Sequence, residues 1–168
     1  LSTPMLYFAS AKIESDGAAM ITASHNPAEY NGLKLCRKNA VPIGLASGLT
    51  EIKELAQKEN LSKGKVKGII TERDIKGEYD EFIASFAAFN GKRFHLAIDT
   101  AHAMGVLELP IYGKLPGVAL CGMLYDTLQK PGTCPHEANP LKTDTLIELQ
   151  HVVRQTKSDM GIAYDGDA

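Results

Sequence analysis

A serine, a histidine and an amide follow a short apolar segment in the first part of the chain. Residues 18–22 lead into Ser24, His25 and Asn26, and Lys34 lies ten residues after the serine. A serine hydroxyl is a poor nucleophile until a base, a metal or prior derivatisation activates it. The cationic and amide groups around Ser24 suit an anion, so we interpret the loop as one that carries a phosphate on Ser24. The alternative is that the serine and histidine only cap the local backbone.

A second polar loop follows the last apolar segment, at the other end of the chain. Asp165 and Asp167 stand on either side of Gly166, directly after residues 159–164. Glycine permits a sharp turn. Oxygen-rich loops of this kind suit Mg²⁺, which keeps some water and shares its coordination with a phosphate. We predict that this loop holds the cation that makes a phosphate on Ser24 transferable; the alternative is an acidic surface turn.

Both loops are expected at the carboxyl ends of strands in an α/β fold. Strands and helices alternate along the chain, which indicates parallel sheets with right-handed crossovers. Ligands of such sheets bind beyond the carboxyl ends of the strands. The first strand, short and apolar, is expected to be buried on both faces. The expected strands are 18–22, 32–36, 94–98, 118–121 and 159–164.

The helices have recognisable starts. Thr3 is expected to be the N-cap of the first helix, with Pro4 at its first position. Ser47 and Asp74 are expected to cap the next two helices, and residues 102–109 are expected to be helical up to a proline kink. The last helix is expected to begin at Thr143 or Thr145, and the lysine- and glycine-rich segment 62–68 is expected to form a surface turn.

Composition limits the class of protein. The chain has 168 residues, of which 44% are hydrophobic and 23% charged, as in ordinary globular proteins. No apolar run reaches the roughly 18 residues of a membrane span, and a net charge of −2 provides no broad basic face for nucleic acid. Three cysteines without CxxC spacing argue against a disulfide framework and a zinc site. A reduced, cytoplasmic protein is therefore expected, and because Leu1 lies within a helix start, a preceding segment is expected as well.

Four segments, in order, resemble the α-D-phosphohexomutases, particularly the phosphomannomutase/phosphoglucomutase branch. Residues 22–34, TASHNP followed by EYNGLK, resemble the active-site serine loop of that family. Residues 161–168, GIAYDGDA, resemble its metal loop, DGDxDR. Residues 99–105 are similar to its D-x-x-N-G-M-G turn, with His102 in place of the asparagine, and residues 131–141 resemble its D-G-x-F-P-N-H-x-P-N-P-L loop.

The resemblance implies a fold and an activity. It implies two adjacent, mixed, largely parallel three-layer α/β domains, the first one truncated. The implied activity is an intramolecular phosphotransfer that interconverts the 1- and 6-phosphates of mannose or glucose through a phosphoserine enzyme and a 1,6-bisphosphate. Mg²⁺ would be the cofactor, and glucose 1,6-bisphosphate or its mannose equivalent the activator. On this basis residues 1–74 are the later part of domain 1, residues 75–90 a connecting helix and residues 91–168 domain 2, ending in the metal loop.

The resemblance also implies residue roles. Ser24 would be the phosphoryl carrier, and Lys34 a candidate general acid or base for the sugar hydroxyl. His25 and Asn26 would steady the phosphate, with His25 part of the catalytic set. The metal ligands would be the phosphorylated serine with two carboxylates, Asp165 and Asp167. The partners implied are small hexose phosphates, with no nucleic acid or membrane partner.

Three other functions compete with this one. A phosphoglucosamine mutase ranks lower, because that branch tends to show SASHNP with a DNG segment, whereas this chain has Thr22 and residues 30–32 read YNG. A non-catalytic sugar-phosphate or metal-binding module on the same fold is a rival of another class. A phosphatase with an aspartyl nucleophile would leave residues 22–27 unexplained. Because the third aspartate of the metal loop and the later domains of the family are missing, the chain alone is expected not to complete a catalytic cycle. The sequence assigns no oligomeric state and no role to His136.

Overall fold

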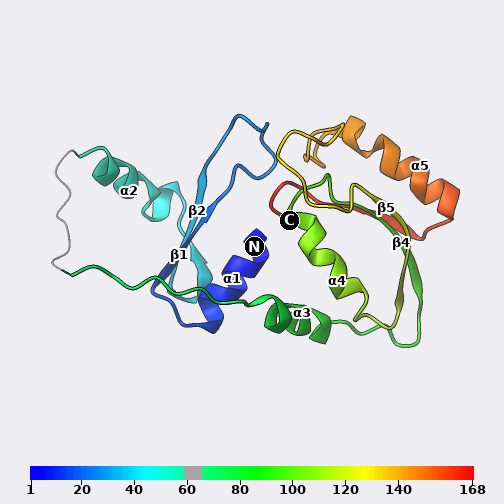
Figure 1. The fold of residues 1–168 in the computed structure, drawn as a ribbon, viewed down its shortest axis with the longest axis horizontal. Coiled ribbons are helices and arrows are strands. Elements are labelled where there is room, and N and C mark those ends of the chain that lie inside the picture. Colours follow the sequence, from blue (N-terminus) through cyan, green and yellow to red (C-terminus); the bar gives the residue numbers. More distant parts are fainter. Residues whose placement is uncertain (59–65) are drawn as a thin grey trace.

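Two three-stranded sheets lie on either side of a layer of helices in the computed structural model of the chain (Figure 1). The structure describes residues 1–58 and 66–168, so the surface turn expected over 62–68 lies largely outside the described residues. Both ends of the chain lie in the middle of the molecule, where Thr3 and Asp167 are hydrogen-bonded. The expected division into residues 1–74, 75–90 and 91–168 stays a prediction.

The first sheet is antiparallel throughout. It consists of β1 (Gly17–Ile21), β2 (Leu33–Arg37) and β3 (Val41–Pro42), in that order. The parallel arrangement expected along the whole chain is therefore wrong for these strands. The reason is the connection between β1 and β2: residues 22–32 contain no helix, so the chain reverses direction and pairs with itself, whereas parallel strands require a longer crossover.

Only one face of the first sheet is covered among the residues that the structure describes. The helix α1 (Thr3–Lys12) packs on the face that contains Cys36, whose side chain is buried against Ser10. On the opposite face, the side chains of Ile21 and Leu33 are 72% and 59% exposed. Successive side chains of a strand point to opposite faces, so one covering helix buries only every second residue. The expectation that 18–22 is buried on both faces is wrong.

The helix α1 begins one residue earlier than expected. Ser2 is the N-cap: its backbone is extended and its side chain accepts a hydrogen bond from the Met5 N–H at 3.4 Å. Thr3 is the first helical residue, and Pro4 follows it. The prediction that Thr3 is the N-cap is therefore wrong, because the serine before it can take the same position. The Thr3 hydroxyl is left to make another contact.

The other early helices begin close to the expected residues. The helix α2 (Leu49–Ala56) starts after Gly48, and the Ser47 hydroxyl accepts the Gly44 N–H rather than capping α2. The helix α3 (Lys76–Ser85) has Ile75 rather than the expected Asp74 as its N-cap, although the Asp74 carboxylate accepts the Lys76 N–H. A buried cluster of Met5, Tyr79 and Ile111 joins α1, α3 and the short helix α4 (Leu109–Tyr112).

The second sheet is parallel, as expected. The central strand β4 (Phe94–Asp99) pairs with β5 (Val118–Leu124) on one side and with β6 (Met160–Ala163) on the other. The helix α5 (Ile147–Thr156) packs against all three strands on the outer face, and α4 lies on the other side, toward the middle of the molecule (Figure 1). A mixed α/β fold is thus confirmed, with a parallel sheet in its second half.

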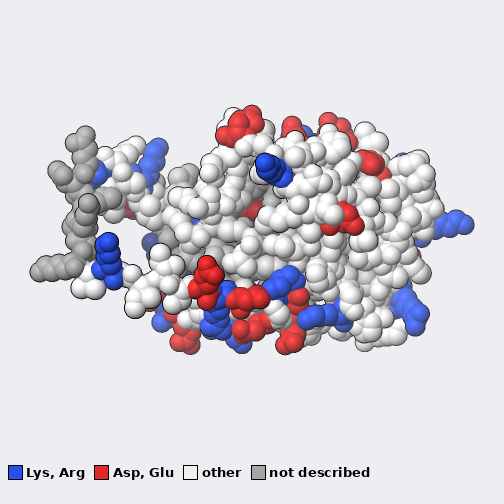
Figure 2. All heavy atoms as spheres, viewed as in Figure 1, with Lys and Arg blue, Asp and Glu red and all other residues white. Residues whose placement is uncertain are grey.

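Charged side chains of both signs are mixed on the face that Figure 2 presents. Around α3, Glu78 pairs with both Lys12 and Arg73, at 3.5 Å and 3.2 Å, and Lys76 pairs with Asp80. Within the part of the chain that the structure describes, no helix combines the length and apolar character that a membrane crossing requires.

Candidate functional site

Ser24 lies in the loop that follows β1, in an unusual backbone conformation. Its φ is 54°, in the left-handed region, which costs free energy for any residue with a side chain. The Ser24 N–H donates to the Thr22 hydroxyl at 2.8 Å, and this contact holds the turn. Backbone conformations of this kind concentrate at functional sites.

The Ser24 hydroxyl contacts two carboxylates from the far end of the chain. Its Oγ donates to Oδ2 of Asp165 at 2.7 Å and lies 3.2 Å from Oδ1 of Asp167. Both aspartates lie in the loop after β6, and residues 24 and 165 are 141 positions apart. The structure therefore brings together the two loops that the sequence analysis selected. The roles of these residues in a reaction remain predictions.

Gly166 allows the two loops to meet. A Cβ at this position would lie 2.2 Å from the backbone oxygen of Ser24, far inside van der Waals contact. Its φ is not in the left-handed region, so close approach, rather than the sharp turn expected, is what requires a glycine. From the sequence, Gly166 was expected only to permit a turn. The tertiary structure shows that its missing side chain makes room for the backbone of Ser24.

Lys34 binds one of the carboxylates directly. Its Nζ lies 2.7 Å from Oδ2 of Asp167, and the Thr3 hydroxyl donates to the same oxygen at 2.7 Å. Burial acts to raise the pKa of Asp167, but hydrogen bonds from Lys34, Thr3 and Thr22, with the charge of Lys34, hold it below its usual value. The Asp167 carboxylate is therefore kept ionised beside Ser24.

The two remaining residues of the serine loop that the sequence selected lie closer to solvent. The His25 Nδ1 is 3.9 Å from Oδ2 of Asp165, and about two fifths of that side chain, 42%, is exposed. Asn26 is exposed, and its backbone N–H donates to the oxygen of Ala23 at 3.1 Å. His25 is thus close to the Asp165 carboxylate, whereas Asn26 is exposed to solvent.

The donor set around Ser24 fits a hard divalent cation only when a phosphate completes it. Among residues 1–58 and 66–168, no group of three or more His, Cys, Asp or Glu side chains is arranged to hold a metal. Two carboxylates and the Ser24 oxygen do converge. Mg²⁺ is commonly bound by one or two carboxylates together with phosphate oxygens and water. The residues present therefore match magnesium with a phosphorylated Ser24, rather than a cage made by the protein alone.

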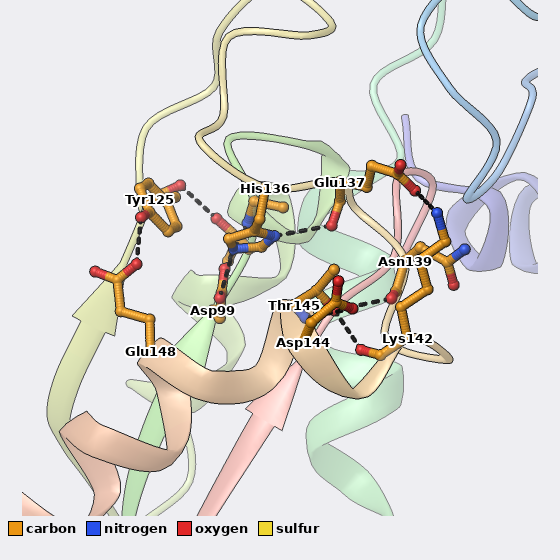
Figure 3. Close-up of polar contacts among 11 residues, drawn as sticks. Asp99, Tyr125, His136, Glu137, Asn139, Lys142, Asp144, Thr145 and Glu148 are labelled. Carbon is orange, nitrogen blue, oxygen red and sulfur yellow. Dashed lines mark hydrogen bonds and ion pairs between the residues drawn. The ribbon is translucent and has the colours of Figure 1, made fainter.

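A hydrogen bond between His136 and the buried Asp99 anchors the loop 131–141 at the end of β4 (Figure 3). The His136 Nε2 lies 3.0 Å from Oδ2 of Asp99, and its Nδ1 lies 2.8 Å from the backbone oxygen of Glu137. Asp99 is only 1% exposed, and this burial raises its pKa, against the opposing effects of the Ala101 N–H and of His136. Sequence reasoning assigned no role to His136; the structure makes it the tether of this loop.

The anchored loop reaches the serine loop. A Cβ on Gly132 would lie 3.4 Å from the side chain of Ala28, so the two loops are in contact there. At the base of loop 131–141, Lys142 pairs with Glu137 at 2.5 Å (Figure 3). The loop 131–141 thus packs against the loop that carries Ser24.

The turn after β4 keeps a left-handed backbone without the glycine and asparagine that such a turn favours. Ala101 and His102 have φ values of 49° and 56°. The Thr100 hydroxyl donates to the oxygen of Tyr125 at 2.6 Å, and the His102 ring contacts the oxygen of Thr127. These contacts tie the turn to the end of β5 and hold the unfavourable conformation.

Sequence reasoning missed two threonines of the site. Thr3 was assigned to a helix cap, and Thr22 was treated only as part of the serine motif. The structure shows that both contact the chemistry-bearing residues, Thr3 through Asp167 and Thr22 through Ser24. The adjacent hydroxyl residues Ser2 and Thr3 were the signal in the sequence: only one of them can cap the helix, which leaves the other hydroxyl for another contact.

Comparisons with known proteins agree on one family. Residues 1–63 match the family described as phosphoglucomutase/phosphomannomutase, alpha/beta/alpha domain I. The chain is 32% identical to a phosphomannomutase of Vibrio cholerae over 98% of its own length and 36% of that protein. It is 31% identical to a phosphoglucomutase of Neisseria meningitidis serogroup B over 100% of its own length and 35% of that protein. The chain thus spans little more than a third of the length of these relatives.

A solved structure shows the same fold. The crystal structure of a putative phosphomannomutase from Thermus thermophilus matches with a TM-score of 0.74 and 24% sequence identity. The match covers 100% of this chain and 38% of that one.

Proposed function

Because the chain belongs to the phosphoglucomutase/phosphomannomutase family, we propose that it carries the phosphoryl-transfer part of a hexose phosphate mutase. The observation that supports this most directly is the contact of the Ser24 hydroxyl with Asp165 and Asp167, made by loops that follow strands of two different sheets. The substrates that we propose are the 1- and 6-phosphates of glucose and mannose.

The proposed reaction starts from phosphorylated Ser24. The bond between phosphorus and Ser24 Oγ breaks, and a bond forms between phosphorus and the free hydroxyl oxygen of the hexose phosphate. The hydroxyl proton leaves the sugar, and a proton returns to Ser24 Oγ. The product is a hexose 1,6-bisphosphate, and return of its other phosphate to Ser24 completes the interconversion. We assign the proton exchange at the sugar hydroxyl to Lys34, whose side chain is 36% exposed beside Asp167.

Asp165, Asp167 and the phosphate on Ser24 would hold Mg²⁺, which would neutralise the charge on the transferred phosphoryl group. The protein contributes position and electrostatics, which dominate phosphoryl transfer. His25 and Asn26 supply donors at the open side of the loop, where an incoming anion would arrive. In this proposal the left-handed backbone of Ser24 directs its oxygen toward the carboxylates before the reaction begins.

The test is peptide mapping by mass spectrometry of the protein in its full-length context, purified without phosphatase treatment. We expect a phosphate on the peptide that contains Ser24 after incubation with glucose 1,6-bisphosphate and Mg²⁺, and its loss to glucose 1-phosphate. The control is Ser24→Ala, which should take up no phosphate. A Ser24 that is never modified and cannot be charged would overturn the mutase proposal and would favour a binding module.

A further inference from the structure

The Asp167 carboxylate is held by three different segments of the chain. Its Oδ2 accepts hydrogen bonds from Thr3 Oγ1 and from Lys34 Nζ, each at 2.7 Å. Its Oδ1 lies 3.2 Å from Ser24 Oγ. One oxygen is therefore occupied by fixed donors, and the other faces the serine.

Thr3 also holds the backbone of the same aspartate. The Thr3 N–H donates to the backbone oxygen of Asp167 at 2.9 Å, so one residue contacts both the main chain and the side chain of its partner, 164 positions away. Thr3 is 5% exposed and Asp167 is 4% exposed, so water does not compete for these contacts. The contacts occur at the first helical residue of α1, where the helix dipole favours a negative charge.

We infer that Thr3 is a positioning residue, whose hydroxyl selects the Asp167 oxygen that faces the phosphate and cation at Ser24. The inference rests on the proposed function, and it concerns a residue outside the serine and aspartate motifs. The terminal torsion of an aspartate is broad, so the carboxylate can turn unless its oxygens are held. Without Thr3, the carboxylate would keep Thr22 and Lys34, and Lys34, on a long and partly exposed side chain, holds this rotation less rigidly than a buried threonine hydroxyl.

A structural role for Thr3 would predict something different. If the residue only supported the start of α1, any change that weakens this start would have the same effect on the site. Ser2 provides the comparison, because its hydroxyl accepts the Met5 N–H and donates to Glu108 at 2.6 Å without contacting Asp167. Ser2→Ala weakens the helix start and leaves the Thr3 hydroxyl in place.

The experiment measures Mn²⁺ binding by electron paramagnetic resonance to the 168-residue chain with phosphoserine incorporated at position 24. We expect Thr3→Val to weaken Mn²⁺ binding about tenfold or more, the usual effect of losing a residue that orients a metal ligand. Thr3→Ser should bind like wild type, because it keeps the hydroxyl. Ser2→Ala should lower the melting temperature while leaving Mn²⁺ affinity unchanged. Thr3→Ala removes the hydroxyl without placing a methyl group toward Asp167, and serves if the valine variant does not fold.

The outcomes separate the two proposals. Asp165→Asn must weaken Mn²⁺ binding relative to wild type; if it does not, the cation is elsewhere and both the proposed function and the role of Thr3 fall. If Asp165→Asn weakens binding but Thr3→Val and Thr3→Ala do not, the metal site stands and the role of Thr3 is overturned. Equal losses of affinity in Ser2→Ala and Thr3→Val would also overturn it, because they would show a general effect of the helix start.

Discussion

The Ser24 hydroxyl donates a hydrogen bond to the Asp165 carboxylate at 2.7 Å, across 141 positions of the sequence. This contact joins the loop after β1 in the antiparallel sheet to the loop after β6 in the parallel sheet. Neither loop has the donor set on its own. The site exists because the two sheets meet at these loops.

Ser24→Ala should show how much the Ser24 hydroxyl contributes to stability. The variant loses one hydrogen bond to a carboxylate, so we expect the free energy of unfolding to fall by about 1 kcal/mol. Urea denaturation measures this change. A loss of several kcal/mol would contradict the expectation and would make the hydroxyl a structural element of the fold.

Gly166→Ala should push the two loops apart. The added Cβ would lie 2.2 Å from the Ser24 backbone oxygen, so the loops must shift, and we expect a loss of about 1–3 kcal/mol in the free energy of unfolding. The matched control is Gly77→Ala on α3, where a Cβ meets nothing within 4 Å. That variant should be more stable than wild type, by about 0.5–1 kcal/mol, because alanine favours the helix. Unchanged stability in Gly166→Ala would contradict the close contact between Gly166 and the backbone of Ser24.

Lys34→Met should change how stability depends on pH. The pKa of Asp167 is lowered in the folded state, so the stability that this carboxylate contributes is present above its unfolded value and is lost as pH falls through the folded one. We expect the variant to be about 1 kcal/mol less stable than wild type near neutral pH. The difference should shrink below about pH 4, the ordinary range of an aspartate.

Urea denaturation at a series of pH values measures this effect, and Lys12→Met is the control. Lys12 pairs with Glu78 at 3.5 Å, and both side chains are exposed, so its removal should have little effect. A difference between wild type and Lys34→Met that stays constant down to acid pH would contradict the coupling between Lys34 and Asp167.

Glu108→Gln should have the opposite pH dependence. Glu108 is buried, and this burial raises its pKa although the Ser2 hydroxyl and Tyr79 oppose the effect. A raised carboxyl pKa means that the folded state binds more protons than the unfolded one, so stability falls as pH rises above about 4.3. Glutamine keeps an oxygen for Ser2 and removes the titration. The stability of the variant relative to wild type should therefore increase with rising pH.

Thermal unfolding monitored by circular dichroism at several pH values tests this, with Glu81→Gln, an exposed residue of α3, as the control. If the glutamine variant at position 108 follows wild type in parallel at every pH, Glu108 does not titrate differently in the folded and unfolded states.

Local pattern in the sequence identified the residues that meet at the candidate site and much of the fold. The polar loop at Ser24 and the carboxylates at Asp165 and Asp167 could be predicted, because each follows an apolar segment with strand-like length. The parallel pairing of β4, β5 and β6 also followed, because helical segments separate these strands. Such features depend on neighbours along the chain, and periodicity and turn residues encode them.

Only the tertiary structure decided which distant groups touch. Whether Ser2 or Thr3 caps α1 could not be read from two adjacent hydroxyl residues; contact with Asp167 and Glu108 assigned them. The uncovered face of the first sheet, the pairing of Lys34 with Asp167 and the need for glycine at position 166 have the same origin. Each depends on how segments of the chain pack in three dimensions. The neighbouring residues in the sequence do not indicate which segments will be in contact.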